Sequence, residues 1–325
     1  MPIHPTYLIT GATGGLGHAI LTTLLASSVP ASSITATSTR ASAASALSPL
    51  GVRFALLDYD DPATLDAAFA GVERLFFVST NTFDNARRRR QHANVVEAAE
   101  RARVGWVVYS SLAIGAVGEG EGAGGRQKVE EAHDVRLMGA HLETERLLRG
   151  SKLNWTAVRE GIYTDAFPVF LSWYPTDPNQ TLHLPSDGAA SFALREELGE
   201  ATAKLLMRGG FENRIVALTG PRAVRFSEIV DVINEMTGRQ VRIEYVGDEE
   251  YVRRNVESDE GGKSKDFYWN WVTLFQAFRD GKMANVSTLM EELLERRPKD
   301  GLEGVRGLLE KSKDYTWHQN YARSA

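Results

Sequence analysis

The chain has 325 residues, of which 43% are hydrophobic and 24% are charged, so it can bury one large core or two smaller ones. Its net charge of -5 creates no basic field for nucleic acid, and the lack of cysteine excludes disulfides, thiol catalysis and thiolate metal sites. The seven histidines are scattered along the chain without a paired motif, so we predict no metal site. No apolar run is long enough for a membrane span. A strand predicted soon after Met1 leaves no room for a signal peptide, which favours the cytoplasm.

The first predicted elements are a strand, a glycine-rich turn and a helix. The apolar run Tyr7–Ile9 leads into Gly11, Gly14 and Gly17, with the spacing GxxGxxG. In a dinucleotide fingerprint these glycines allow the turn, the approach of a pyrophosphate and close packing of the helix. Free N–H groups at the helix N-terminus then attract the phosphates. We therefore predict nucleotide binding, although a plain turn and helix cap can have the same glycines.

Strands and helices alternate through the rest of the N-terminal half. Strands are predicted over 33–38, 52–57, 74–78 and 106–109. Apolar strands separated by helices indicate an α/β fold with a parallel, doubly wound sheet of the Rossmann type. Ligands of such sheets bind beyond the carboxyl ends of the strands. The polar residues at those ends are Thr39, Arg40, Asp58, Tyr59, Ser79, Thr80, Ser110 and Ser111.

The end of the second strand indicates which dinucleotide is preferred. NAD-specific proteins usually place an acid there to hold the ribose 2′-hydroxyl, but this chain has Ser38, Thr39 and Arg40. An arginine can instead form a charge-assisted pair with a 2′-phosphate. The sequence thus favours NADP over NAD, with an ordinary exposed arginine as the alternative.

Two further segments near the predicted site each leave two interpretations open. Residues 115–136 are rich in Gly and Glu, and they form either a lid or a solvated loop without function. Arginines at 87–90 open a helix predicted over 84–103, and they form either a solvated face or an anion site.

Two later segments carry motifs of a known family. Residues 139–145 read GAHLETE, and residues 153–167 read LNWTAVREGIYTDAF. Together they resemble the HxxTE…WTxxRxGxYxxxF signature of NmrA-like proteins, which are atypical short-chain dehydrogenase/reductases. The nearest branch contains NADPH-dependent quinone reductases and triphenylmethane or azo dye reductases. Segments 226–230, 235–241 and 247–251 also resemble that branch, so the similarity covers nearly the whole chain.

The resemblance implies an NADP-binding Rossmann domain over 1–160 and a smaller, mixed C-terminal substrate lobe over 161–325, with NADP(H) in the cleft between them. It leaves a homodimer open. One departure is Glu160, where the reductase branch often has Asn, and this puts the substrate in doubt more than the cofactor. Carried over by position, the cofactor-binding residues are Gly11, Thr13, Gly14, Leu16 and Gly17 at the pyrophosphate, Arg40 at the 2′-phosphate, Asp58 and Tyr59 at the adenine, Ser79 and Thr80 near the nicotinamide ribose, and Glu160, Gly161, Ile162 and Tyr163 at the nicotinamide.

The chain lacks the Tyr-x-x-x-Lys pair on which ordinary short-chain dehydrogenases depend. None of its tyrosines has a lysine four residues later; Tyr109 is followed by Ala113 and Tyr163 by Phe167. An isolated carbonyl becomes an alkoxide on hydride attack and needs an acid beside it. A quinone, an imine or a dye spreads or neutralises the incoming charge, so positioning could be enough. We therefore expect a small aromatic or conjugated substrate.

Two candidate catalytic side chains could still donate a proton. His141, Thr144 and Glu145 share one helix face, and His141 is the better acid because its unperturbed pKa lies near neutrality. The alternative is that His141 and Glu145 are struts that hold the helix against the cofactor loop. Tyr163 offers a hydroxyl near the nicotinamide, and its alternative is a packed core tyrosine.

The C-terminal part is rich in aromatic residues, and the cluster over 267–278 is predicted to form a helix packed on the Rossmann lobe. Core packing is the default interpretation, although a flat conjugated substrate would also want aromatic walls. A helix is predicted from Phe192, and a strand over 213–220 is expected to return to the main sheet.

These observations predict an NADPH-dependent oxidoreductase that reduces a conjugated small molecule, such as a quinone, an imine or a dye. Two alternatives belong to other classes. One is a regulator that senses NADP(H), turns nothing over and docks to a protein partner. The other is a biosynthetic cyclase or isomerase that uses the same cleft without net redox change.

Overall fold

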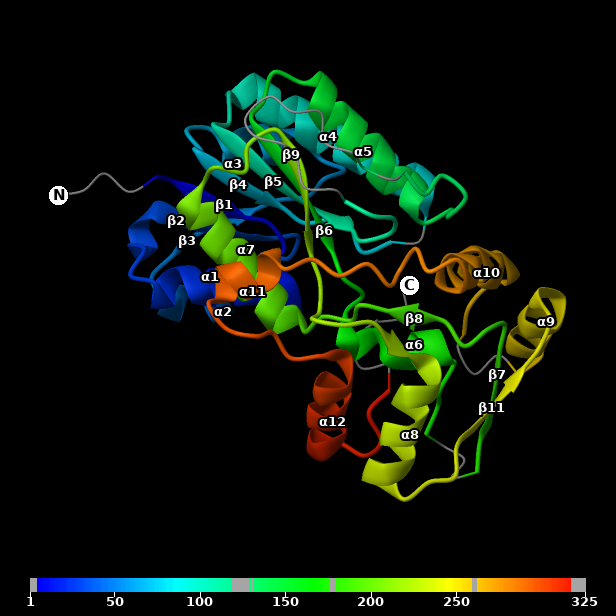
Figure 1. Ribbon diagram of the computed structural model, residues 1–325. Coiled ribbons are helices and arrows are strands. Elements are labelled where there is room, and N and C mark those ends of the chain that lie inside the picture. The colour runs from blue at the N-terminus through cyan, green and yellow to red at the C-terminus, as the bar shows by residue number, and fades with distance from the viewer. Residues whose placement is uncertain are drawn as a thin grey trace.

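The structure is a computed structural model that describes residues 5–82, 84–117, 129, 131–175, 179–258 and 262–316. Most of the segment predicted as a lid or a solvated loop, residues 118–128 and 130, lies outside the described residues. The described chain forms a large sheet flanked by helices, with a smaller lobe at one end (Figure 1).

The centre of the structure is a seven-stranded sheet in which every pairing is parallel. The strand order β3-β2-β1-β4-β5-β6-β9 is that of a doubly wound Rossmann sheet, so the predicted fold class is confirmed. β9 lies beside β6, as predicted for residues 213–220. The strands are β1 (Tyr7–Ile9), β2 (Ile34–Ser38), β3 (Arg53–Leu56), β4 (Arg74–Phe77), β5 (Trp106–Leu112), β6 (Trp155–Glu160) and β9 (Arg214–Leu218).

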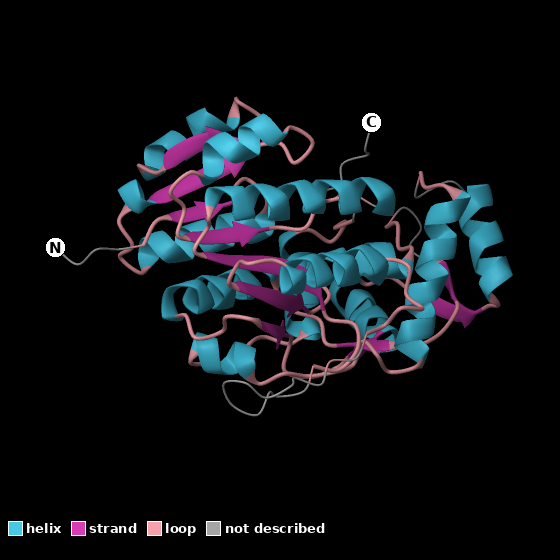
Figure 2. Cartoon of the chain, turned by 90° about the horizontal axis from the view of Figure 1, so that it is seen from above, coloured by secondary structure: helices cyan, strands magenta, loops and turns pink. Residues whose placement is uncertain are grey.

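Helices cover both faces of this sheet (Figure 2). Successive side chains of a strand point to opposite faces, so Tyr7 and Ile9 of β1 join one core while Leu8 joins the other. The first core packs against α1 (Gly15–Ala26), α2 (Ala43–Leu47), α7 (Arg195–Arg208) and α11 (Leu289–Leu294), and the second against α3 (Pro62–Phe69), α4 (Asn85–Ala102) and α5 (Met138–Gly150).

β5 is longer than the strand predicted over 106–109. It continues to Leu112, because β6 pairs with it as far as Glu160 opposite Leu112. Ser110 and Ser111 therefore lie within the strand, and the prediction that they follow its end is wrong. Both residues still line a cleft at this edge of the sheet.

α7 begins at Arg195, later than the predicted start at Phe192. The reason is a bridge between Ala193 and Tyr163, which keeps this part of the chain extended until Leu194. The delay places Arg195 in the first turn of the helix, at the edge of the cleft.

The remaining elements form a smaller lobe with an aromatic core (Figure 1). β8 pairs with β10 antiparallel, and β7 pairs with β11 parallel. The helix predicted over 267–278 is present, but it packs in the core of the smaller lobe and not on the Rossmann lobe. Its Trp271 stacks on Phe170 with ring centroids 5.3 Å apart. The division at residue 160 stays a prediction. The elements are α6 (Phe167–Leu171), β7 (Thr181–Leu184), β8 (Ala189–Ala190), β10 (Val224–Arg225), α8 (Phe226–Thr237), β11 (Arg242–Tyr245), α9 (Asp248–Ser258), α10 (Lys265–Arg279) and α12 (Gly301–Lys311).

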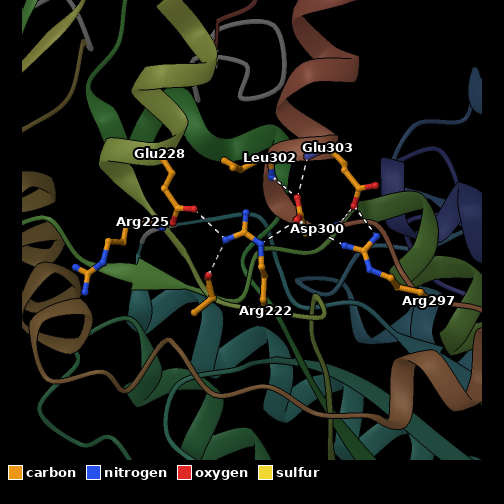
Figure 3. A network of polar contacts seen from close by, with 8 residues as sticks. Arg222, Arg225, Glu228, Arg297, Asp300, Leu302 and Glu303 are labelled. Carbon is orange, nitrogen blue, oxygen red and sulfur yellow. Dashed lines mark hydrogen bonds and ion pairs between the residues drawn. The ribbon is translucent and has the colours of Figure 1, made fainter. Parts of the chain in front are cut away.

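A polar network joins α8 to α12 within this lobe (Figure 3). The Arg222 guanidinium donates to Asp300 Oδ2 over 2.9 Å and to Glu228 Oε1 over 3.0 Å. Asp300 also caps α12 by accepting from the backbone N–H groups of Leu302 and Glu303. These partly exposed contacts fix how the two helices meet, at a distance from the cleft.

Candidate active site

A cleft of about 870 Å³ runs along the carboxyl ends of the sheet strands and is closed on one side by the smaller lobe. Such a volume is typical of a small-molecule or cofactor site. Its wall contains all the residues predicted to bind the cofactor and both predicted proton donors, namely Gly11, Thr13, Gly14, Leu16, Gly17, Arg40, Asp58, Tyr59, Ser79, Thr80, His141, Glu160, Gly161, Ile162 and Tyr163.

The phosphate turn at one end of the cleft has the geometry that its glycines predict. Gly11 has a φ of +60°, and its carbonyl accepts from the Gly14 N–H over 2.8 Å. A Cβ on Gly17 would lie 2.4 Å from Gly11 O, so only glycine lets α1 start this close to the turn. No side chain caps the first turn of α1. The N–H groups of this turn are therefore open to an anion, which fits a pyrophosphate.

Arg195 lies beside the same turn, which the sequence did not reveal. A Cβ on Gly15 would lie 2.6 Å from Arg195 Cδ. Arg195 also pairs with Asp165 over 2.8 Å, and its guanidinium lies 4.5 Å from the centre of the Tyr163 ring. The helix N-terminus and this arginine give the middle of the cleft a positive field.

Two of the three residues expected at the adenine end of the cleft differ in burial and in hydrogen bonding. Arg40 is exposed, and within the described part of the chain its guanidinium has no ion-pair partner. It is therefore available to a phosphate. Tyr59 is nearly buried, with its hydroxyl 2.8 Å from Thr10 Oγ1 and 3.0 Å from Val78 O. Tyr59 thus fixes the loops after β1 and β4 as well as lining the cleft.

A buried polar network lies behind the other end of the cleft. The Thr80 N–H donates to His92 Nε2 over 3.1 Å, so the proton of the neutral ring is on Nδ1, which lies 2.7 Å from Thr144 Oγ1. The Tyr109 hydroxyl lies 2.8 Å from His141 Nδ1. Burial and nearby cations lower the pKa of His92 to about 3 and hold that of His141 well below its usual range.

The expectation that His141 titrates near neutrality is therefore wrong. Its ring is 7% exposed and neutral at pH 7, so it has no imidazolium proton to donate. Glu145, one helical turn later, is held by Ser111 over 2.7 Å and by Arg159 over 2.9 and 3.0 Å. These contacts agree with the alternative that both residues are struts between α5 and the sheet.

Glu160 and Tyr163 form a hydrogen-bonded pair in the cleft wall, close to Arg195. The Tyr163 hydroxyl donates to Glu160 Oε2 over 2.5 Å. Glu160 is 1% exposed, and burial raises the pKa of its carboxyl group to about 8, against the smaller lowering effects of Tyr163 and Arg195. At pH 7 this side chain is consequently a neutral acid.

Arg88 belongs to the run of arginines at 87–90, for which the sequence left open a solvated face or an anion site. Of the arginines at 87–90 it is the buried one, 6% exposed, and it lines the cleft. One nitrogen donates to Thr82 O, whereas Nε and Nη1 find no hydrogen-bond partner in the described chain. A buried guanidinium with open donors is costly unless a ligand accepts from it. Only the long-range packing of α4 distinguishes Arg88 from its solvated neighbours.

The side of the cleft formed by the smaller lobe is apolar and aromatic. Phe170 and Trp271 line it as a stacked pair, and both are buried within the aromatic core. Leu137, Val169 and Leu274 extend this wall. A flat conjugated molecule would fit against it. Among the described residues, no group of three His, Cys, Asp or Glu could hold a metal ion, and no helix is long and apolar enough to cross a membrane.

The fold and the cleft are those of a dinucleotide-binding protein of the Rossmann type. A family model described as NAD(P)H-binding matches residues 11–179. The NmrA-like family domain-containing oxidoreductase flvB of Aspergillus flavus is 43% identical over 319 residues, which make up 98% of this chain and 99% of that protein. Quinone oxidoreductase 2 of Escherichia coli is 29% identical over 245 residues, 75% of this chain and 78% of that protein.

Two crystal structures with bound cofactor have the same fold. The NADPH complex of the Escherichia coli NADPH-dependent quinone oxidoreductase has a TM-score of 0.78 and 25% identity, covering 94% of this chain and 100% of that chain. The NADP(H) complex of the Citrobacter sp. triphenylmethane reductase has a TM-score of 0.74 and 28% identity, covering 93% and 99%. The chain belongs to the NmrA-like family of NAD(P)H-binding oxidoreductases, and its cofactor is NADP(H).

Proposed function

We propose that the protein transfers a hydride from NADPH to a small conjugated acceptor, such as a quinone, an imine or a dye. The observation that carries this proposal is a continuous cleft that joins an uncapped phosphate turn at Gly14 to an aromatic wall at Phe170 and Trp271. One end suits a dinucleotide and the other suits a flat apolar molecule.

The residues at the cofactor end have separate roles. The N–H groups of the turn from Gly11 to Gly17 hold the pyrophosphate, and Arg40 holds the 2′-phosphate. Asp58 and Tyr59 border the adenine, and Ser79 and Thr80 lie near the nicotinamide ribose. The residues from Glu160 to Tyr163 border the nicotinamide. When bound, NADPH supplies the hydride, and the chain's own residues orient the acceptor and exclude water around it.

The sequence supports this acceptor class. No tyrosine of the chain is followed by a lysine four residues later, and on α5 the residue one turn after His141 is Glu145, which is buried in an ion pair with Arg159 of β6. An alkoxide formed from an isolated carbonyl would have no Tyr-x-x-x-Lys pair as its partner. The names of relatives, which include quinone oxidoreductase, azoreductase and triphenylmethane reductase, support a conjugated acceptor.

The test is NADPH oxidation by the purified protein with a panel of quinones, imines and dyes, beside an unconjugated ketone of similar size. We expect a conjugated acceptor to be reduced much faster than the ketone. His141→Ala and Tyr163→Phe should each lower quinone turnover by less than about a hundredfold, since a positioned acid contributes about 10²–10⁴-fold. A ketone reduced as fast as the quinone, with one of these mutations stopping both reactions, would contradict the proposal.

The same assay separates the two other classes. A regulator would bind NADPH tightly and oxidise none of it with any acceptor. A cyclase or isomerase would convert a substrate to a product of equal mass without consuming NADPH. Neither result is compatible with hydride transfer.

A further inference from the structure

We propose that Glu160 is the proton donor to the acceptor and that Tyr163 positions its carboxyl group. This inference rests on the proposed reduction of a conjugated acceptor and adds the catalytic acid that the missing Tyr-x-x-x-Lys pair leaves unassigned. It also concerns a position at which this chain departs from the reductase branch that it resembles, where asparagine is common.

The position of Glu160 suits this role. It ends β6 at the carboxyl edge of the sheet, paired in register with Leu112 of β5 and Leu218 of β9, and it lines the cleft. Oε2 accepts the hydrogen bond from Tyr163, whereas Oε1 has no hydrogen-bond partner within the described chain. One oxygen is thus held in place, and the other is left for a ligand.

The charged and titratable groups around Glu160 are few. Tyr163 contacts it from the loop after β6, and Arg195 acts on it from the start of α7. Arg195 is itself paired with the Asp165 carboxyl group over 2.8 Å. The strand neighbours Leu112 and Leu218 bring no charge. Burial therefore dominates, and the raised pKa of about 8 keeps the proton on the carboxyl group at neutral pH.

The proposed step is the transfer of a proton from Glu160 to the acceptor. The O–H bond of Glu160 breaks, its electron pair stays on the carboxylate, and a new O–H or N–H bond forms on the acceptor. The hydride supplied by NADPH brings the second hydrogen and both electrons, so a quinone becomes a hydroquinone and an imine becomes an amine. The Tyr163 hydroxyl and the Arg195 charge stabilise the carboxylate until water returns the proton. An asparagine amide at this position could not release a proton in this way.

A cationic triphenylmethane dye provides the control, because hydride addition to its central carbon gives the neutral leuco form without any proton. The experiment measures NADPH oxidation by wild type and Glu160→Gln with a quinone and with such a dye. With the quinone at pH 7 we expect Glu160→Gln to lose roughly a hundredfold in kcat, the low end of general acid catalysis. With the dye, the loss in kcat should be much smaller than with the quinone, because reduction of the dye needs no proton. NADPH affinity, measured by fluorescence, separates a loss of cofactor binding from a loss of proton transfer.

The pH profile gives an independent readout. Wild-type quinone reduction should fall as pH rises through about 8, where the carboxyl group loses its proton, whereas dye reduction should show no such fall. Tyr163→Phe should move the fall to higher pH, because the hydrogen bond from Tyr163 lowers the pKa of Glu160. A role in folding alone would not move this profile.

Equal losses with quinone and dye, or a wild-type quinone profile that stays flat through pH 8, would overturn the assignment of Glu160. If Glu160→Gln does not fold, the two wild-type profiles and Glu160→Asn, which introduces the amide of the reductase branch, decide the question. A wild-type protein that oxidises no NADPH with any acceptor would instead overturn the proposed function.

Discussion

Glu145 and Arg159 form a fully buried, two-pronged ion pair between α5 and β6. Glu145 Oε1 lies 3.0 Å from Arg159 Nε, and Oε2 lies 2.9 Å from Nη2. Their side chains are 1% and 0% exposed. Because the carboxylate also accepts from Ser111, its oxygens are committed to structure. This arrangement explains why the motif residue Glu145 supports the cleft without facing the substrate.

Glu145→Gln should destabilise the protein by about 3–5 kcal/mol, since it leaves the Arg159 guanidinium buried without a counter-charge. Urea denaturation measures this loss in the free energy of unfolding. Asp66→Asn is the matched control, because Asp66 pairs with Arg101 at a surface site where the side chains are 51% and 50% exposed. The control should change stability by less than about 1 kcal/mol. Similar losses in the two variants would contradict the structural role of the buried pair.

Arg40→Ala should weaken NADPH binding by roughly tenfold or more and leave NADH binding nearly unchanged. A charge-assisted pair with the 2′-phosphate contributes about 1.5–3 kcal/mol, and NADH has no such phosphate. Titration of cofactor fluorescence gives both dissociation constants. If the variant lost affinity for both cofactors equally, Arg40 would not be the group that selects NADPH.

Gly14→Val should abolish dinucleotide binding while the protein stays folded. The φ of Gly14 is -89°, which any residue adopts, but a branched side chain would occupy the space of the pyrophosphate. Gly17→Val should instead prevent folding, because a Cβ there would lie 2.4 Å from a backbone oxygen. Thermal melting and NADPH titration separate the two outcomes. A folded Gly14→Val that binds NADPH normally would show that this glycine serves the turn alone.

The buried Glu160 also predicts a pH dependence of stability in the protein without cofactor. Between its ordinary pKa of 4.5 and the folded-state pKa of about 8, the folded protein keeps a proton that the unfolded chain releases. Stability of the wild type should therefore fall as pH rises through this window, by about 1.4 kcal/mol for each pH unit, relative to Glu160→Gln. Denaturation of both proteins at several pH values tests this. A constant difference between them would mean that the Glu160 carboxyl group does not retain its proton.

Local sequence patterns were sufficient for the parts of the site that depend on local geometry. Gly11 and Gly17 indicate the phosphate turn, because Gly11 adopts a left-handed backbone and Gly17 leaves room for the close approach of α1 to the turn. Arg40 could be placed because a strand end fixes its position at the edge of the sheet. The return of residues 213–220 to the sheet was also predictable from their apolar pattern.

The protonation states of His141 and Glu160 and the position of Arg88 depend on burial and long-range packing, which local sequence patterns do not reveal. His141 loses its expected pKa because the packing of α5 encloses it beside Tyr109. Arg88 differs from its arginine neighbours only through the direction in which α4 faces the cleft. Glu160 stood out as a departure from the related branch, but its value as an acid depends on being enclosed between β5, β9 and α7.

The central claim, hydride transfer from NADPH to a conjugated acceptor, is tested most directly with NADPH deuterated at both C4 positions. A cationic triphenylmethane dye or a cyclic imine is the acceptor, because either forms a carbon–hydrogen bond that does not exchange with water. Mass spectrometry of the product should show one deuterium per molecule at that carbon, with one NADPH consumed for each product formed. A reduced product without deuterium, or NADPH that binds but is never consumed with any acceptor, would contradict the account.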